Sequence, residues 1–347
     1  MSISPKVSIY ATVFNNADVV KASLDSIINQ LKLFSTEFEF VVVDNFSVDG
    51  TYEILQGFSR RYPNFKVLRE RCSRGKGRRI AFDNTIGKYA FYVDLDAIYL
   101  PIFAKLISVS LDICGKNDVI NNPSIGFGFM HRDTMERIGN WYDLNVSEDI
   151  EFFARAVDRG VHVRVIPVHA SENQVLRDRE DRYATGAIER MSRAIRNERD
   201  KILGNGIAKI GHIIRSKMTT KLLASLIFAG LRLVGRKAYI YSKYPNNEEY
   251  LLANIDILEP ASFGIPAKYY VFGMAVNRLM QASCETCNSL FDRLSEIGFD
   301  TVRYTSKNYM IAFTGRTDKS VIEHYCAFAS KTDAAIARPS GNALTDG

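Results

Sequence analysis

The sequence predicts an α/β fold around a mostly parallel sheet, followed by a small α+β domain. Apolar runs of strand length alternate with segments of helical spacing through the first half of the chain. The connections between them are short, as in doubly wound sheets. The run at 38–43 is apolar enough to be buried on both faces, which is typical of a parallel strand.

The composition indicates a globular protein, and the length suggests two domains, with one or three as the alternatives. The chain has 347 residues, of which 46% are hydrophobic and 24% are charged. Its formal net charge of +6 favours acidic partners, such as a nucleoside diphosphate or an anionic membrane surface, without choosing between them. The five cysteines do not suggest a disulfide framework. Neither a secretory signal nor a conventional membrane span is predicted.

Four strands and three helices are predicted in the first ninety-odd residues. The strands are residues 7–13, 38–43, 65–68 and 89–94. The first helix would be capped by Asn15 and Asn16, because amide side chains accept hydrogen bonds from free N–H groups at a helix start. The third helix would open in the basic, glycine-containing loop 71–79 and run through Ile80 and Ile86.

The fourth strand ends in two carboxylates at alternate positions, Asp94 and Asp96. Successive strand residues point to opposite faces, so both carboxylates would lie on one side. In open α/β sheets, ligands bind at the carboxyl ends of the strands. Two carboxylates there can hold a hard divalent cation that also binds phosphate oxygens. The alternative is a pair of solvated aspartates in a turn.

Three further features follow the acidic pair. Residues 121–132 are expected to form a strand whose glycines let a ligand approach the backbone. Ser147 would cap a helix beginning with Glu148 and Asp149, whose charges suit the positive end of the helix dipole. His169 comes just after a further strand at 161–166.

Three motifs in this order resemble the nucleotide-sugar half of a family-2 glycosyltransferase of the GT-A fold. They are the first strand, the turn at 42–51, and the Asp94-Leu95-Asp96 pair. The resemblance covers about residues 5–175 and implies a GT-A-type nucleotide-binding sandwich at 1–200. Leu95 is bulkier than the residue often found between the aspartates, and Asn45 stands where many members carry a second aspartate. Both departures leave the donor unidentified.

The resemblance implies an inverting transfer of a sugar, typically a hexosyl group, from a nucleotide diphosphate sugar with Mn²⁺ or Mg²⁺ as cofactor. The implied roles comprise metal ligation by Asp96, Asp94 and His169, nucleotide binding by Asp44, Asn45, Lys76, Arg78 and Asp94, and catalysis by Asp149 with Glu148. The acceptor would be a saccharide or a polyprenyl-phosphate-type lipid, and no nucleic-acid partner is expected. The alternatives are a nucleotidyltransferase of related fold and a non-catalytic membrane-associated scaffold.

The segment 201–245 carries basic residues and no Asp or Glu. Its basic residues are Lys201, Lys209, Arg215, Lys217, Lys221, Arg232, Arg236, Lys237 and Lys243. Its apolar run at 222–231 is too short to span a bilayer. It predicts an amphipathic helix or helix pair on an anionic membrane, and hence a cytoplasmic enzyme attached peripherally to the inner face. The alternative is a helix that packs against the catalytic domain or a second copy of the chain.

Residues 246–347 are predicted to form the small α+β domain and a disordered tail. Strands are expected at 250–258, 269–272, 301–304 and 309–313, and helices at 276–294 and from Lys319. Cys284 and Cys287 form a single CxxC pair, which packs on a helix in the favoured interpretation, since a zinc site needs a second ligand pair. No chemistry is assigned to this part of the chain.

Overall fold

The computed structural model describes residues 5–122, 126–173, 187–205, 247–275, 284–299 and 309–323. The chain divides into two compact units. One unit comprises Met1–Val165 with Ala170–Asp256, and the other comprises Ile166–His169 with Ile257–Gly347. The predicted boundaries near residues 200 and 245 stay predictions.

The first unit alternates strands and helices along most of its length. In chain order its elements are β1 (Val7–Val13), α1 (Val20–Ile28), α2 (Phe34–Glu37), β2 (Phe38–Asp44), α3 (Thr51–Arg61), β3 (Phe65–Arg69), α4 (Arg74–Asp83), β4 (Tyr89–Tyr92), β5 (Ala97–Tyr99), α5 (Ile102–Ile113), β6 (Asp118–Asn122), β7 (Phe127–His131), α6 (Arg132–Ile138), α7 (Glu148–Asp158), β8 (His162–Val165), β9 (Ser171–Asn173), α8 (Ala187–Asn205) and α11 (Asn247–Asn254). The four strands predicted before residue 95 are all present, each within two residues of its expected bounds.

One eight-stranded sheet organises this unit, with the strand order β10-β8-β6-β7-β4-β1-β2-β3, where β10 is Asp256–Ile257. Strand β1 is parallel to β2 and β4, β2 is parallel to β3, and β6 is parallel to β8. Strand β7 is antiparallel to both of its neighbours. The prediction of an α/β fold around a mostly parallel sheet is therefore confirmed.

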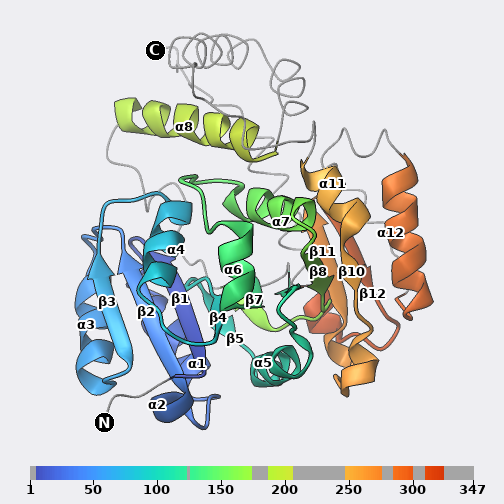
Figure 1. Cartoon of the computed structure of the whole chain (residues 1–347), viewed down its shortest axis with the longest axis horizontal. Coiled ribbons are helices and arrows are strands. Elements are labelled where there is room, and N and C mark those ends of the chain that lie inside the picture. Colours follow the sequence, from blue (N-terminus) through green and yellow to red (C-terminus); the bar gives the residue numbers. More distant parts are fainter. Residues whose placement is uncertain are drawn as a thin grey trace, which may run out of the picture. The chain divides into compact units, whose positions relative to one another are not determined.

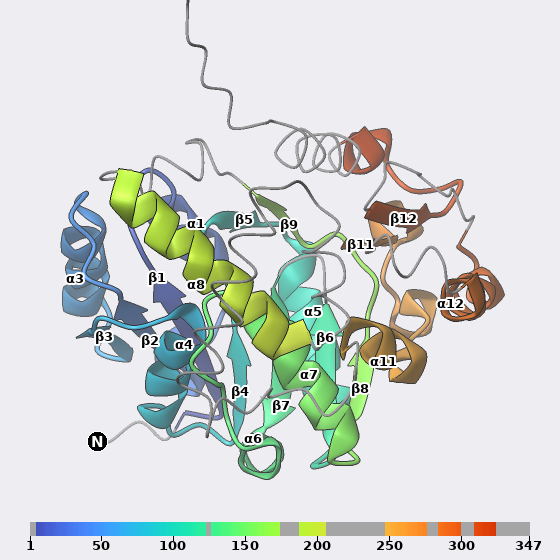
Figure 2. The ribbon, with the colours of Figure 1, turned by 90° about the horizontal axis from the view of Figure 1, so that it is seen from above.

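Helices cover both faces of the sheet. Figures 1 and 2 show α4, α6 and α7 on one side and α1 and α5 on the other. Neighbouring residues of β4 serve the two faces, because side chains alternate along a strand. Tyr92 packs against Trp141 on the first side, and Phe91 packs against Phe103 of α5 on the second. The core is thus aromatic on both faces.

Three parallel strands end together and bring three loops to one edge. Because β1 pairs with β2 and with β4, their carboxyl ends are neighbours. Asn16, in the loop after β1, donates its side-chain amide to the Leu95 carbonyl and its backbone N–H to Thr51 Oγ1 at 2.7 Å. Asn16 therefore connects the loops after β1, β2 and β4. The prediction that Asn16 caps α1 was wrong, because α1 begins at Val20.

Three other predictions of local structure were wrong. The strand predicted at 121–132 is divided between two antiparallel strands, the end of β6 and the whole of β7, with Gly126 at a φ of 55° before β7. Helix α4 ends at Asp83, so Ile86 lies beyond it and is exposed. Residues 247–254 form a helix rather than a strand, because a short apolar run fits both and packing against α7 decides.

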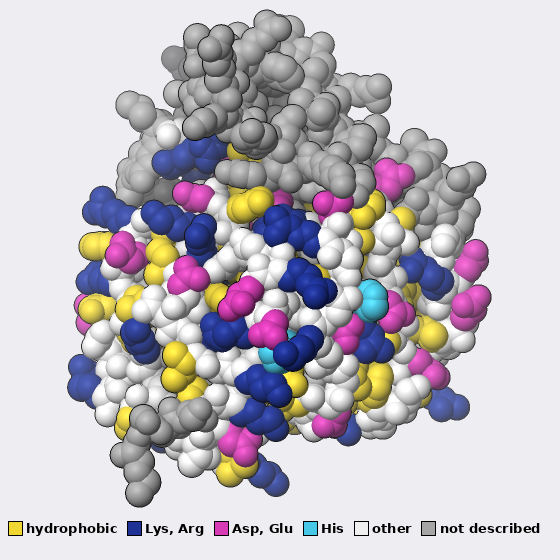
Figure 3. All heavy atoms as spheres, viewed as in Figure 1, with side chains coloured by type: hydrophobic (Ala, Val, Ile, Leu, Met, Phe, Trp, Pro, Cys, Tyr) yellow, Lys and Arg dark blue, Asp and Glu magenta, His cyan; other side chains and the backbone are white. Residues whose placement is uncertain are grey.

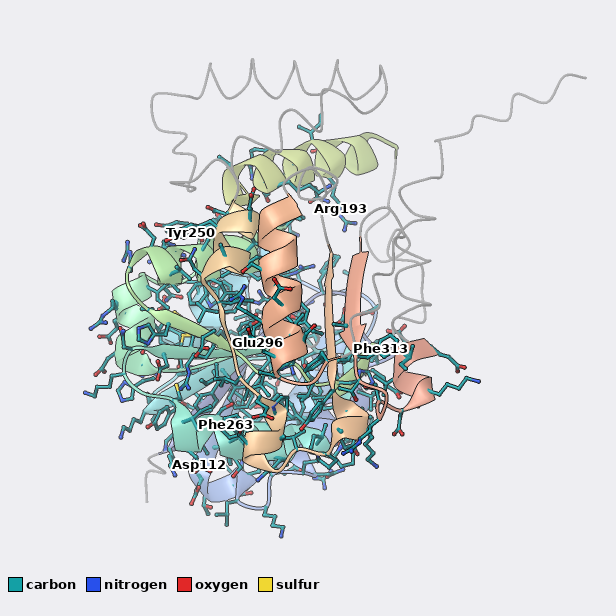
Figure 4. The ribbon with its side chains drawn as sticks, turned by 90° about the vertical axis from the view of Figure 1, so that its right-hand side faces the viewer. Asp112, Arg193, Tyr250, Phe263, Glu296 and Phe313 are labelled. Atoms are coloured by element: carbon teal, nitrogen blue, oxygen red, sulfur yellow. The ribbon has the colours of Figure 1, made fainter. Side chains whose placement is uncertain are left out.

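The second unit contains an antiparallel strand pair and a helix, seen in Figure 4 with Glu296 and Phe313 labelled. Strand β11 (Val271–Ala275) pairs with β12 (Tyr309–Phe313), and α12 is Cys284–Glu296. The strand predicted at 309–313 is confirmed. Several predicted features lie outside the described residues: the strand at 301–304, the start of the helix at 276–283, the basic residues from 206 to 245 and the tail.

The described helices do not include one long and apolar enough to cross a membrane. The face shown in Figure 3 mixes positive and negative side chains. The described part of this face therefore offers no basic surface of a single sign.

Candidate active site

The acidic turn connects β4 to β5. Strand β4 ends at Tyr92, so Asp94 and Asp96 lie in the loop that follows it. Leu95 is buried between them, whereas both aspartates are partly exposed. The Asp94 carbonyl accepts a hydrogen bond of 2.9 Å from the Tyr99 hydroxyl. The turn is thus anchored through its backbone while its carboxylates keep access to solvent.

Arg78 of α4 joins the acidic turn to the start of α7. Its Nη2 donates to Asp94 Oδ1 at 2.8 Å, and its Nη1 donates to Glu148 Oε1 at 3.0 Å. Arg74 Nη1 also lies 3.3 Å from Glu148 Oε1. The Arg78 side chain is only 3% exposed, so a buried cation lies between carboxylates from two separate elements.

Two glycines allow α4 to approach its neighbours closely enough for this arrangement. The Gly75 N–H donates to the Leu144 carbonyl at 2.8 Å, and a Cβ at Gly75 would overlap the Tyr142 carbonyl. A Cβ at Gly77 would overlap the Thr12 side chain of β1. Glycine is therefore required at both positions, and Arg78 follows directly on the buried face of the helix.

The predicted basic loop is mainly the first turns of α4. Ser73 caps this helix by accepting a hydrogen bond of 3.1 Å from the Lys76 N–H. The Lys76 side chain is exposed, whereas Arg78 is engaged inside the protein. Of these two predicted nucleotide-binding residues, Lys76 alone has a solvent-facing side chain.

The ionisation of this cluster follows from its burial. Burial raises the pKa of Glu148, and the nearby Arg74 and Arg78 only partly offset this. Burial opposes the charge of Arg78, but Asp94 and Glu148 outweigh it and raise the Arg78 pKa. Burial also raises the Tyr92 pKa well above its ordinary value, so the ring beneath the guanidinium stays neutral. Arg78 is therefore a permanent cation.

Glu148 and Asp149 begin α7, as predicted, but in different environments. Glu148 is buried and bound by the arginines, whereas Asp149 is partly exposed. Ser147 has a φ of 62° and makes no side-chain capping bond, so the prediction of a serine cap was wrong. The two acidic residues thus divide into an internal charge partner and an accessible carboxylate.

Helix α8 supports the start of α7. Buried Asp200 accepts a hydrogen bond of 2.8 Å from the Asn145 N–H. Gly204 lies so close to Ser147 that a Cβ would come within 2.7 Å of the Ser147 carbonyl oxygen. A segment far along the chain therefore helps to fix the position of Asp149.

The turn after β2 buries its aspartate, whereas the acidic turn after β4 leaves Asp94 partly exposed. Asp44 is fully buried, with Arg69 Nε at 3.2 Å from Oδ2 and the Ser47 N–H at 3.2 Å from both oxygens. Burial raises the Asp44 pKa, although the Ser47 and Arg69 contacts act against this. Asn45 Oδ1 accepts from the Cys72 N–H at 2.9 Å, which ties this turn to the chain before α4.

Asp49 shapes the rest of this turn. Its carboxylate accepts from the Ala17 N–H at 3.0 Å, the Thr51 N–H at 3.1 Å and the Thr51 hydroxyl at 2.6 Å. Burial alone would raise its pKa, but these hydrogen bonds to the ionised form lower it overall. Gly50, with a φ of 96°, starts α3. Asp49 therefore has a structural role in the turn.

Two glycines at β7 approach β4 and the acidic turn that follows it. A Cβ at Gly126 would overlap Asp94 Oδ2, and its φ of 55° also disfavours a side chain. A Cβ at Gly128 would lie 2.7 Å from the Tyr92 ring. These glycines were expected to let a ligand approach, but in this structure they make room for residues of the same chain.

His169 belongs to the other unit. Its side chain is buried, and its backbone N–H donates to the Tyr269 carbonyl at 2.7 Å. Its role as a metal ligand stays a prediction. Among the described residues, no group of three or more His, Cys, Asp or Glu side chains gathers as a metal site. A cation in the first unit would depend on Asp94 and Asp96.

Arg74 and Trp141 are components of the site that sequence reasoning did not assign. Trp141 lies 4.9 Å from the Arg78 guanidinium and stacks on Phe152 of α7 at 4.2 Å. A signal for the buried arginine was available, because Gly75, Arg78 and Phe82 recur at helical spacing on the buried face of α4. No comparable signal identified its partners, which come from distant segments.

A family model described as Glycosyl transferase family 2 matches residues 8–137. Over these residues the chain is similar to family 2 glycosyltransferases, which confirms the resemblance inferred from the sequence. The remainder of the chain is not covered by that match.

Curated relatives match only in part. The chain is 28% identical to Glycosyltransferase AglE of Haloferax volcanii over 164 residues, or 44% of this chain and 54% of the relative. It is 31% identical to the Poly(ribitol-phosphate) beta-glucosyltransferase of Bacillus spizizenii over 94 residues, or 26% of this chain and 15% of the relative. The chain thus spans about half or less of the length of these relatives.

A solved structure of S. aureus TarS 1-349 in complex with UDP-GlcNAc is similar at a TM-score of 0.46 and 15% identity, covering 90% of this chain and 100% of that chain. A mannosyltransferase from Pyrobaculum calidifontis in complex with GDP-Man and Mn²⁺ is similar at a TM-score of 0.44 and 15% identity, covering 72% and 86%.

Proposed function

We propose that this protein is an inverting, metal-dependent glycosyltransferase that moves a sugar from a nucleotide diphosphate sugar to an acceptor. The observation that carries this proposal is the pairing of a partly exposed acidic turn with the acidic start of α7, joined through Arg78. Donor chemistry and acceptor chemistry need adjacent but distinct acidic groups. The family 2 match over residues 8–137 supports the same class.

The acidic turn suits a hard divalent cation in the type of its donor atoms. Asp94 keeps 41% of its side chain exposed although Arg78 occupies one of its oxygens. Asp96 is the proposed direct ligand and Asp94 the assisting one, and diphosphate oxygens would fill further positions. Mn²⁺ or Mg²⁺ would supply charge stabilisation for the departing diphosphate. Lys76, exposed in the first turn of α4, is the proposed further contact for the diphosphate.

Asp149 is the proposed general base, because it is the accessible carboxylate at the start of α7. It would take the proton of an acceptor hydroxyl as that oxygen attacks the anomeric carbon from the face opposite the diphosphate. Glu148 would act as a charge partner of Arg78. A lipid phosphate acceptor is already ionised, so Asp149 would then matter less.

The acceptor is proposed to be a saccharide or a membrane-proximal, lipid-linked molecule. The support comes from the sequence alone, since the basic segment 201–245 combines positive charge with an apolar run. Sedimentation with anionic vesicles at low and high salt tests this, with Arg232, Arg236 and Lys237 changed to Glu for comparison. Wild-type protein that stays in the supernatant at low salt would favour a soluble acceptor and a packing role for the segment.

The central experiment is calorimetric titration of UDP and GDP with and without Mn²⁺. Asp96→Ala should remove the metal-dependent part of nucleotide binding. Asp112→Ala is the matched control, because Asp112 is an exposed aspartate on α5 (Figure 4). Equal affinity in wild type and Asp96→Ala would contradict the metal assignment. Product analysis with a nucleotide sugar that binds would separate the alternatives. Transfer of the sugar supports a glycosyltransferase, synthesis of a sugar nucleotide would indicate a nucleotidyltransferase, and no turnover would indicate an inactive scaffold.

Turnover separates the base from the donor site. Asp149→Asn should leave nucleotide affinity intact and lower turnover by about 10²–10⁴-fold. Asp158→Asn, an exposed charge at the end of the same helix, is the control. Turnover within a few-fold of wild type in Asp149→Asn would indicate an ionised acceptor or another base.

A further inference from the structure

Arg78 provides the direct ion-pair link between the proposed cation site and α7 among the described residues. Its Nη2 donates to Asp94 Oδ1, and its Nη1 donates to Glu148 Oε1. The two carboxylates differ in exposure, because Asp94 is 41% exposed and Glu148 is buried. A ligand can therefore reach one partner of Arg78 and not the other.

A divalent cation on Asp94 would compete with Arg78 for the same carboxylate. Arg78 is buried, so any charge compensation that it loses from Asp94 has to come from within the protein. Glu148 Oε2 is buried and has no hydrogen-bond partner among the described residues, which leaves an acceptor for the second arm of the fork. Arg78 can thus transfer its interaction from the acidic turn to the start of α7.

We propose that Arg78 is a positioning residue that couples cation binding at the acidic turn to the start of α7, and so to Asp149. This rests on the proposed function, since it assumes that the cation binds at Asp94 and Asp96. The coupling has a measurable consequence: a change in the interaction between Arg78 and Glu148 should alter the affinity for the cation. The contact of Glu148 with Arg74 remains when Arg78 is removed.

Trp141 supplies a built-in reporter, because it is the single tryptophan of the chain. Its ring lies 4.9 Å from the Arg78 guanidinium, stacks on Phe152 of α7 and donates Nε1–H to the Tyr10 hydroxyl at 3.1 Å. A displacement of Arg78 toward Glu148 changes the charge beside this ring. Its emission should therefore shift when Mg²⁺ and nucleotide bind.

A double-mutant cycle tests the coupling. Mn²⁺ affinity is measured by electron paramagnetic resonance in the presence of UDP or GDP for wild type, Glu148→Gln, Arg78→Met and the double variant. Glu148→Gln should weaken Mn²⁺ binding about tenfold in wild type, because Arg78 then lacks its alternative partner. In the Arg78→Met background the same change should stay within about twofold.

Two further variants keep the test decisive. Arg78→Lys retains the charge but lacks the planar fork, so it should also uncouple the sites and serves if Arg78→Met does not fold. Arg79→Met, an exposed neighbour on α4, should retain the full effect of Glu148→Gln. The Trp141 emission change with Mg²⁺ should be lost in Arg78→Lys and kept in Arg79→Met.

The outcomes separate the two proposals. Equal effects of Glu148→Gln in both backgrounds, with Mn²⁺ bound normally by wild type, would overturn the coupling and leave the proposed function intact. Absence of Mn²⁺ binding to wild type with either nucleotide would overturn both. An unchanged Trp141 emission on Mg²⁺ and nucleotide binding would also contradict the coupling.

Discussion

Two aspartate–arginine pairs, one at the carboxyl end of β2 and one after β4, show opposite patterns of burial. After β2, Asp44 is fully buried and its partner Arg69 is 33% exposed. After β4, Asp94 is 41% exposed and its partner Arg78 is 3% exposed. The strands are separated by β1 alone, so the same edge of the sheet offers a cation at one point and an anion at the other.

The difference indicates which member of each pair a ligand meets. At β4 the accessible group is a carboxylate, which suits a metal ion. At β2 it is a guanidinium, which also lies 4.3 Å from the Tyr52 ring and 5.0 Å from the Phe46 ring. Arg69, rather than Asp44, is therefore the group in this pair that would first meet a nucleotide, and Asp44 would act through it.

Removal of the buried arginine, Arg78, should have the largest effect on stability. Arg78→Met should destabilise the protein by about 3–5 kcal/mol, because it leaves Glu148 and Asp94 without their shared cation. Arg69→Met should cost no more than about half as much, because the Asp44 carboxylate keeps its hydrogen bonds from the Ser47 N–H. Urea denaturation of the two variants measures both values, and equal losses would contradict the contrast in burial.

The exposed carboxylate can be displaced without changing its charge. Gly126→Ala should place a Cβ against Asp94 Oδ2 and, by displacing this carboxylate, weaken Mn²⁺ binding about tenfold. Gly160→Ala carries the same backbone penalty at a φ of 70°, but no atom lies within 4 Å of its Cβ position. Equal Mn²⁺ affinities in these two variants would show that contact with Asp94 is unimportant.

The exposed guanidinium can be tested through the nucleotide. Arg69→Met should weaken binding of UDP or GDP about tenfold, which corresponds to the loss of one charge-assisted interaction. Mn²⁺ affinity in the absence of nucleotide should not change, because the contacts of Arg69 are with Asp44 and other residues around the β2 turn rather than with the acidic turn. Arg61→Met, an arginine at the exposed end of α3, is the control. Unaltered nucleotide affinity in Arg69→Met would return Asp44 to the direct role.

The smallest expected effect concerns Asp49, the aspartate held by hydrogen bonds alone. Its pKa is lowered, so its ionised form contributes stability above its unfolded pKa, and this is lost as pH falls through the folded pKa, below about pH 4. Asp49→Asn should cost about 1 kcal/mol at neutral pH and less in acid. Melting temperatures from pH 7 to pH 3 measure this, with Glu53→Gln as control. A constant difference across that range would contradict the assignment.

Local sequence was enough to identify the strands before residue 95 and the acidic pair in the loop after β4. A strand can be predicted from local sequence, because the apolar run that forms it and the turn residues that end it are adjacent along the chain. The acidic start of α7 was predicted for the same reason. Where a short apolar run fits both a helix and a strand, as at 247–254, local sequence was insufficient.

Tertiary structure alone decided which charged groups face inward. The environment of Arg78 depends on Asp94 and Glu148, which lie 16 and 70 positions away along the chain. The burial of Asp44 likewise depends on Arg69 from the next strand. A charged side chain is buried only where its partners compensate the cost of its desolvation. These partners come from distant segments, so the local sequence pattern does not identify them. The sequence therefore determined where the acidic groups stand along the chain, and packing determined which of them a ligand can reach.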